Sequence, residues 1–383
     1  MSFRSHAARV EGTPFPRESS RTVFVAWRDL RFAKGRFALM GSVVVLITLL
    51  VGLLSGLTAG LGRQNTGAIT ALPADHIAFD TPANGQDLSY AESVVTESQW
   101  RRVATTEGVS SAEPVGISTA KAAAGESGLT VSAFGVRSGS PLVPGGAPDR
   151  EDTAVLTTPV AESLGVGPGD AITVAGRDLK VGAVHGEESF GHLPAIWIDL
   201  GTWRHIAPPG GTGTERTATF VALRTTADFD ATATDRLAGT MTVSKSASLS
   251  AIGSYTSENG SLQLMRGFLF AISALVIGAF FTVWTIQRSG DIAVLEALGA
   301  STGRLVRDAL GQALVLLTTG TALGTALAAA AGAALSGTVP FALTPATLLI
   351  PAAVMIVLGS LGAAVAVRRI TSVDPLTALG SAR

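Results

Sequence analysis

The fold of this chain is decided by the stretch Gln287-Arg288-Ser289-Gly290-Asp291-Ile292-Ala293-Val294-Leu295-Glu296-Ala297-Leu298-Gly299-Ala300-Ser301-Thr302-Gly303-Arg304-Leu305-Val306-Arg307-Asp308. It is charged and amphipathic, and a long apolar run adjoins each of its ends. A soluble protein has no reason to place such a segment there, whereas a membrane protein does when another protein binds it from the cytoplasm. The stretch therefore predicts a cytoplasmic connection between two membrane spans.

Outward from this stretch, four apolar runs are long enough to cross a bilayer, which takes about 20 helical residues. None of them contains Asp, Glu, Lys, Arg or His; they are Phe37–Leu61, Gly267–Ile286, Ala309–Leu335 and Leu348–Val367. The first run is longer than the roughly 7–15 apolar residues of a cleaved signal peptide, so we expect an uncleaved signal-anchor. The fold class predicted is a membrane α-helical protein with four transmembrane helices.

The flanking charges predict the orientation, because short loops rich in Lys and Arg stay in the cytoplasm. Residues 336–346, between the third and fourth runs, carry no charge, and residues 62–266 contain 22 Asp and Glu against 14 Lys and Arg, a net charge of −8. Basic residues flank the first run on its N-terminal side and the fourth on its C-terminal side; they are Arg21, Arg28, Arg31, Lys34, Arg36, Arg368 and Arg369. We expect a multi-pass cell-membrane protein with both termini cytoplasmic and the large insert outside.

These boundaries predict nine segments along the chain. They are a cytoplasmic tail and interfacial helix at 1–36, a first span at 37–61, an extracytoplasmic domain at 62–264, a second span at 265–286, a cytoplasmic coupling segment at 287–308, a third span at 309–335, a short external loop at 336–346, a fourth span at 347–367 and a cytoplasmic tail at 368–383.

The inserted domain is predicted to be α+β, without disulfides because the chain has no cysteine. Its clearest piece predicts a strand in 152–159, a helical turn in 160–164, a Gly/Pro/Asp turn in 165–170 and a hairpin in 171–184 that turns around 175–178. Farther on, Asn259-Gly260 predicts a helix break or hinge.

In the charged stretch, Ile292, Leu295 and Leu298 recur every three residues and form one apolar stripe. Gly299 is suited to end this helix in a left-handed conformation, and Ser301 is suited to cap the next helix, which continues into the third span. Such an element would transmit a push from a cytoplasmic partner to the span. The pattern by itself is equally compatible with an ordinary amphipathic loop.

Three motifs resemble the FtsX/MacB-type family of ABC transporter permeases. The charged stretch is similar to the family pattern R..EIAVL.ALGAS...I, residues 368–380 to the terminal pattern R....DP...AL, and residues 152–184 to the external domain of MacB-type members. The resemblance covers nearly the whole chain after residue 20. Within the family, overall size and residues 26–39 look most like the haem-exporter permeases of Gram-positive bacteria.

The resemblance implies a permease that is driven by a separate ABC ATPase subunit. The residues implied to contact that ATPase are Asp291, Ile292, Leu295, Glu296, Leu298 and Gly299. The chain lacks a Gly-x4-Gly-Lys-Ser/Thr motif, so ATP-Mg is expected on the partner, and no cofactor is expected in this chain. Four spans are few for a translocation pathway, which favours a homodimer and a 2+2 complex in membrane lipid.

No constellation of residues indicates catalysis, a resident metal or nucleic-acid binding. His185, Glu187, Glu188 and His192 cluster in the sequence, and this spacing is compatible with a metal or haem ligand set or, more commonly, with a solvated loop. We therefore expect no catalytic site in this chain, which would form part of an ATP-hydrolysing complex through its partner ATPase.

The substrate implied by the finer resemblance is haem, a flat apolar molecule that needs apolar walls, an axial ligand and cations for its propionates. Candidate residues near the outer ends of the first two spans are Tyr255, Glu258, Met265, Arg63, Arg266 and Phe268, and a histidine folded down from the external domain is a further axial candidate. The same residues also suit plain interfacial anchoring. Export of another amphiphile, such as a peptide, drug or lipid, and an FtsX-like signal transmitter that transports nothing are the alternatives.

Overall fold

The structure is a computed structural model that describes residues 34–143, 145–207, 216–287, 290, 294, 299, 301–335, 337 and 339–370. They fall into two compact units, which we describe separately. The membrane unit takes its described residues from Met1–Ser55, Gly267–Ala334 and Leu343–Arg383. The inserted unit consists of Gly56–Arg266 and Leu335–Ala342. The predicted interfacial helix and C-terminal tail lie almost wholly outside the described residues.

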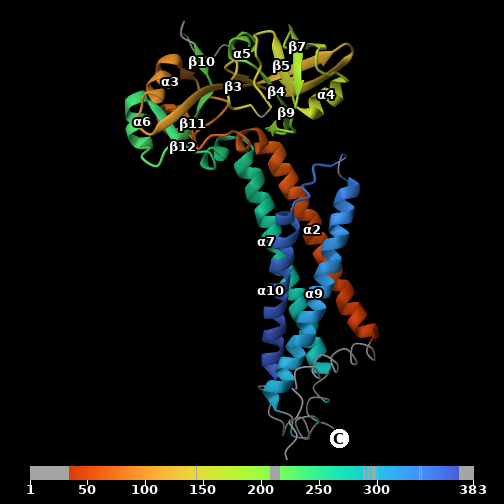
Figure 1. Ribbon diagram of the computed structural model, residues 1–383. Helices are drawn as coiled ribbons and strands as arrows, with labels where there is room; N and C mark the ends of the chain where they lie inside the picture. The colour runs from red at the N-terminus through yellow and green to blue at the C-terminus, as the bar shows by residue number, and fades with distance from the viewer. Residues whose placement is uncertain are drawn as a thin grey trace, which may run out of the picture. The chain divides into compact units, whose positions relative to one another are not determined.

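The four predicted membrane spans are long helices, labelled in Figure 1: α2 (Lys34–Thr70), α7 (Tyr255–Gln287), α9 (Thr302–Leu335) and α10 (Pro345–Ile370). Each is long and apolar enough to cross a membrane, which confirms the predicted fold class. In the membrane unit their buried side chains form one cluster, which includes Met40, Val44, Ile277, Phe281, Trp284, Leu317 and Met355. Their outward faces carry large exposed apolar residues, as expected of helices whose solvent is lipid.

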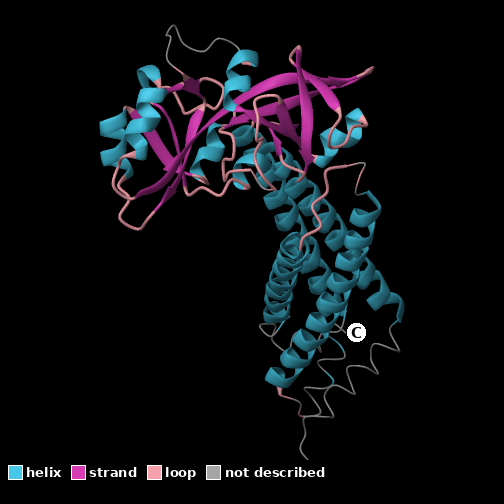
Figure 2. Cartoon of the chain, turned by 45° about the horizontal axis from the view of Figure 1, so that its top comes forward, coloured by secondary structure: helices cyan, strands magenta, loops and turns pink. Residues whose placement is uncertain are grey.

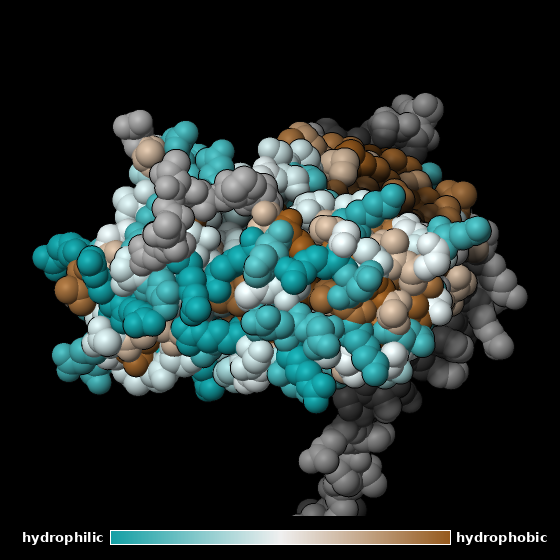
Figure 3. All heavy atoms as spheres, turned by 90° about the horizontal axis from the view of Figure 1, so that it is seen from above, coloured by the Kyte–Doolittle hydropathy of each residue, from teal (hydrophilic) through white to brown (hydrophobic). Residues whose placement is uncertain are grey.

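The inserted unit is rich in strands, drawn in magenta in Figure 2. Its strands are β1 (His76–Asp80), β2 (Val95–Thr96), β3 (Val109–Ala124), β4 (Ser127–Val136), β5 (Thr153–Leu156), β6 (Ala171–Val174), β7 (Arg177–Val184), β8 (Ser189–Phe190), β9 (Leu193–Asp199), β10 (Thr217–Ala218), β11 (Phe220–Thr225) and β12 (Thr240–Ser244). Its short helices are α3 (Glu97–Ala104), α4 (Thr158–Leu164), α5 (Leu200–Ile206), α6 (Ala231–Ala238) and two 3₁₀ helices at Ala83–Gly85 and Ala247–Ala251. One face of this unit is mainly hydrophilic (Figure 3).

The main sheet runs in the order β12-β1-β11-β3-β4-β9-β5-β7-β6, and β6 also pairs with β3. The pairings from β3 through β6 therefore close into a ring. The 16-residue strand β3 makes this possible, because its first half pairs with β11 while its second half pairs with β4 and β6. Closure leaves fewer unpaired strand edges exposed to solvent.

The local sequence explains the helix ends of the inserted unit. Thr96 and Gln99 form a reciprocal capping box at the start of α3, with the Thr96 amide donating to Gln99 Oε1 at 2.8 Å. Gly165 ends α4 with φ +67°, a left-handed conformation that glycine adopts at low cost. The predicted order of strand, helical turn and hairpin in 152–184 is thus confirmed by β5, α4, β6 and β7.

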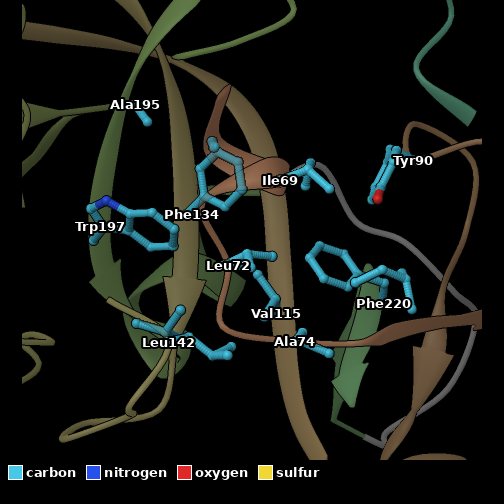
Figure 4. Packing of buried hydrophobic residues seen from close by; sticks show 14 of the residues in the cluster. Ile69, Leu72, Ala74, Tyr90, Val115, Phe134, Leu142, Ala195, Trp197 and Phe220 are labelled. Atoms are coloured by element: carbon cyan, nitrogen blue, oxygen red, sulfur yellow. The ribbon is translucent and has the colours of Figure 1, made fainter. Parts of the chain in front are cut away.

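The last turn of α2 and the residues that follow it are part of the core of the inserted unit. In Figure 4, Ile69 and Leu72 lie among the aromatic side chains Phe134, Trp197 and Phe220. These five side chains are at most 1% exposed. This burial makes the C-terminal end of α2 part of the hydrophobic core of the inserted unit.

Tyr90 adds a polar contact to that core. Its hydroxyl donates to Ser248 Oγ at 2.9 Å, and burial raises the pKa of the Tyr90 phenol well above its usual value. The hydroxyl therefore stays protonated at ordinary pH and remains a donor. Its ring makes edge-on contacts with Phe79, Phe190 and Phe220.

The predicted helix break at Asn259-Gly260 is wrong, because α7 runs without interruption from Tyr255 to Gln287. Both residues lie in the second turn of this helix. The first turn is held from outside the helix, since Asn65 of α2 binds both Ser254 and Glu258. A glycine at this place costs helix stability, which such contacts offset.

The connection between α9 and α10 folds onto α2. The Ala342 amide donates to the Gly56 carbonyl oxygen at 2.9 Å. A Cβ atom on Gly56 would lie 2.1 Å from the Phe341 ring, and one on Gly60 would lie 1.8 Å from the Pro340 carbonyl oxygen. The two glycines thus provide the space in which this connection lies.

Candidate functional site

A polar cluster joins the C-terminal part of α2, the N-terminal turn of α7 and the turn between β8 and β9. The Glu258 Oε2 atom accepts hydrogen bonds from His192 Nε2 at 2.8 Å and from Asn65 Nδ2 at 3.0 Å. Asn65 Nδ2 also lies 3.2 Å from Ser254 Oγ. All four residues belong to the inserted unit, although up to 193 positions of sequence separate them.

The cluster is anchored on one side and accessible on the other. Asn65 is only 2% exposed, whereas the side chains of Glu258 and His192 are 42% and 35% exposed. Both hydrogen bonds to Glu258 end on the same oxygen, and an ionised carboxylate has about four lone-pair positions. The Glu258 carboxylate is thus held in place and still has capacity to bind a cation or a metal.

The backbone of the β8–β9 turn places His192. The Gly191 amide donates to the Asn65 carbonyl oxygen at 3.0 Å, and the His192 amide donates to the Gln64 carbonyl oxygen at 3.1 Å. These two bonds dock the turn on the side of α2. The imidazole then extends from a fixed backbone to the carboxylate on α7.

One face of α7 continues from Glu258 as an apolar surface. Met265 and Ile272 follow Glu258 at intervals of seven residues, which places them on the same side of a helix, and Phe268 lies beside them. Their exposed fractions are 50% for Met265, 61% for Phe268 and 58% for Ile272. Met265 belongs to the inserted unit together with Glu258, whereas Phe268 and Ile272 belong to the membrane unit.

The remaining predicted substrate residues are placed differently. Tyr255 is half-buried and packs against the core of the inserted unit. Arg63 is exposed and lies two positions before Asn65, and therefore on nearly the opposite side of α2. Arg266 is half-buried next to Met265. The structure thus brings Glu258 together with His192 and Asn65, but not with Arg63.

The sequence cluster of His185, Glu187, Glu188 and His192 does not form a metal site: within the described residues, no group of three or more His, Asp or Glu side chains is placed to hold a metal ion. His185 instead packs beside Gly145. The sequence did not predict that Asn65 and Ser254 belong to this polar cluster. An asparagine within a helix and a serine just before one are common, and neither indicates a contact with a distant part of the chain.

Most of the predicted ATPase-coupling residues, Asp291, Ile292, Leu295, Glu296 and Leu298, lie outside the described residues. Gly299 is described and has φ +92°, in the left-handed region that glycine favours. The helix α9 begins directly after Ser301, whose carbonyl accepts the Arg304 and Leu305 amides. The structure thus describes a turn and a helix start where both were expected.

These observations define a multi-pass membrane protein in which a folded α+β domain is inserted between the first two of four spans. The family description "MacB-like periplasmic core domain" matches residues 40–236, and "FtsX-like permease C-terminal" matches residues 264–375. The chain belongs to the FtsX/MacB-type family of ABC transporter permeases. A permease of this kind works with a partner ATPase subunit.

Curated relatives match nearly end to end. A candidate hemin transport system permease protein HrtB of Staphylococcus haemolyticus is 24% identical over 93% of this chain and 99% of its own length. An uncharacterised ABC transporter permease of Mycobacterium tuberculosis is 23% identical over 94% of this chain and 99% of its own length.

Two solved structures are similar to part of this chain. The extracellular domain of the transporter YknZ from Gram-positive bacteria is 16% identical, with a TM-score of 0.33 over 43% of this chain and 90% of that domain. The periplasmic region of MacB from Actinobacillus actinomycetemcomitans is 13% identical, with a TM-score of 0.33 over 47% of this chain and 92% of that region.

Proposed function

We propose that this chain is the permease subunit of an ATP-driven efflux transporter that exports haem from the membrane as a homodimer. The observation that carries the proposal is the Glu258 carboxylate, which His192 and Asn65 hold on the same helix as the exposed Met265. The end-to-end similarity to relatives named as hemin transport permeases points in the same direction.

The chemistry of haem fits this helix. The porphyrin face is apolar and partitions into lipid, so that a site open to the bilayer requires little desolvation. Met265, Phe268 and Ile272 offer apolar contact, and the Glu258 carboxylate is a hard oxygen ligand suited to ferric iron. Arg266 is the cation that we propose for the propionates of a haem bound by Glu258, because Arg63 lies on nearly the opposite side of α2 from Asn65. Tyr255 is a second oxygen donor near the start of α7.

The test is a spectrum of the purified complex. The permease is isolated together with its ATPase from haem-fed cells, and its absorption spectrum is recorded. The same complex in its haem-free form is then titrated with haemin. We expect a saturable Soret band that Glu258→Gln weakens strongly, whereas Glu162→Gln, a change on the exposed side of α4, leaves it unchanged. Absence of saturable haemin binding to the wild-type complex would refute haem as substrate.

That negative result would still leave the permease assignment. Export of a different amphiphile would then be indicated by stimulation of ATP hydrolysis by a peptide, drug or lipid. A signal transmitter would be indicated by ATP-dependent activation of an external partner without any transport.

The proposed orientation has both termini and residues 287–308 in the cytoplasm and the inserted unit outside. Cysteine labelling is clean in this chain because it has no native cysteine. Ser127 is exposed at the start of β4, so Ser127→Cys should react with a membrane-impermeant maleimide in intact cells. Labelling of this cysteine only after the membrane is permeabilised would show that the orientation is opposite to the one proposed.

The proposed coupling to the ATPase rests on the apolar stripe and its charged edge. Leu295→Asp or Glu296→Lys should reduce co-purification of the ATPase, because buried apolar anchors dominate the affinity of such interfaces. The matched control is Glu126→Lys at the tip of the β3–β4 hairpin, which should not change it. Unchanged co-purification and transport in both coupling variants would disprove this role.

A further inference from the structure

The turn between β8 and β9 has an unusual residue in its second position. Phe190 pairs with Leu193, so that Gly191 and His192 form a two-residue hairpin loop with φ values of +58° and +65°. Two consecutive positive φ angles define a type I′ turn, in which glycine is preferred. A histidine in this conformation is strained, and such strain persists only where other contacts outweigh it.

A second hairpin in the same unit provides the comparison. Val174 pairs with Arg177, and the loop Ala175-Gly176 has φ values of +47° and +83°. There the glycine occupies the second position, and Ala175 in the first position is the non-glycine residue with a positive φ. In the β8–β9 turn the glycine comes first, and a histidine occupies the second position with a positive φ.

The contacts of that histidine account for the strain. Its backbone amide is bonded to the Gln64 carbonyl of α2, while its Nε2 lies 2.8 Å from Glu258 Oε2 on α7. Asn65 approaches the same carboxylate oxygen from α2 and is itself almost fully buried. The Asn65 Nδ2 atom donates to Glu258 Oε2 and to Ser254 Oγ, whereas its Oδ1 atom is among the buried atoms of the described residues that have no hydrogen-bond partner.

We propose that His192 is a positioning residue that, with Asn65, fixes the Glu258 carboxylate for substrate binding. This inference rests on the proposed role of Glu258 as the haem ligand. His192 belongs to the β8–β9 turn, whereas Glu258 lies at the start of a membrane helix, so the orientation of the ligand depends on how the turn is docked on α2. His192 thereby makes substrate affinity sensitive to the position of the inserted domain's strands.

The experiment uses the full permease–ATPase complex and haemin titration. The variant His192→Gly removes the imidazole, and it puts glycine, the residue best suited to a positive φ, at this position of the turn. We expect the melting temperature of the complex to be retained and the affinity for haemin to fall about tenfold, the effect of losing one hydrogen bond to a charged group. The Soret maximum of the remaining complex should shift, because the ligand orientation changes.

Two further variants make the result specific. His192→Gln keeps an N–H donor of similar reach, and we expect it to restore most of the affinity. Ala175→Gly makes the same kind of turn change in the other hairpin and should leave both affinity and spectrum unchanged.

The outcomes separate this inference from the proposed function. Lack of saturable haemin binding by the wild-type complex defeats both. Wild-type binding that Glu258→Gln abolishes but His192→Gly leaves intact, with an unshifted Soret band, overturns the positioning role alone. A lower melting temperature in His192→Gly would also overturn it, because it would assign His192 a structural role.

Discussion

The two units of this permease are packed by different means. In the inserted unit, the largest fully buried side chains are aromatic, with the rings of Phe134 and Trp197 only 4.8 Å apart. In the membrane unit, helices come close to one another at glycines. A Cβ atom on Gly324 would lie 2.7 Å from the Val45 carbonyl oxygen, and Gly362 packs on the backbone of Gly278.

The difference follows from the solvent. In water, burial of a large apolar side chain stabilises the fold by roughly 25 cal/mol per Å². In lipid there is no such gain, because the acyl chains are as apolar as leucine, and helices associate through close van der Waals packing that small residues permit. The helix α2 experiences both conditions, since Leu46 and Leu50 are 61% and 54% exposed whereas Ile69, in its last turn, is buried.

The largest effect is expected from the aromatic core. Trp197→Ala should destabilise the inserted unit by about 3–5 kcal/mol, through lost burial and the cavity left behind. The loss is measured by urea titration of the full chain in detergent, with protease resistance of the inserted unit as readout. Leu275→Ala, at a position 72% exposed on α7, is the control and should change the midpoint little. Equal losses in both variants would contradict the comparison.

An intermediate effect is expected where α2 meets α9. Gly324→Ala places a methyl group against the Val45 carbonyl and the Thr48 side chain, and should cost about 1–3 kcal/mol. Thermal melting of the detergent-solubilised permease measures it. In the same helix a Cβ atom on Gly311 would meet nothing within 4 Å, so Gly311→Ala should be neutral or slightly stabilising. If Gly311→Ala were the more damaging change, close helix packing would not be the stabilising factor.

The smallest effect on overall stability is expected at the α9–α10 connection. Gly60→Ala should displace Pro340 and loosen this connection locally, without unfolding either unit. A cysteine at Ala342, which is 1% exposed, should then react with a maleimide roughly tenfold faster, the effect of about 1.4 kcal/mol of local opening. Gly62→Ala, where nothing lies within 4 Å, is the paired control. Unchanged reactivity in Gly60→Ala would show that the connection does not need this glycine.

Much of the fold could be predicted because its signals are local. Uncharged runs such as Phe37–Leu61 predict spans from length alone, and the turn residues around Gly165 and Gly176 predict the β5–β7 region. The prediction at Asn259-Gly260 was wrong because the propensity of two residues was outweighed by the contacts of the first turn of α7. The predicted α9–α10 loop gave no sign of its contact with Gly56 and Gly60, since that contact joins distant parts of the chain.

The sequence by itself determined the number of membrane spans, the position and class of the inserted domain and the family, because each depends on periodicity, composition or motifs along the chain. It also singled out Glu258 by its place beside a span. Only the tertiary structure decided which groups surround that carboxylate. His192 and Asn65 reach it from a hairpin turn and from another helix, and hydrogen bonds across 66 and 193 residues leave no periodic trace in the sequence.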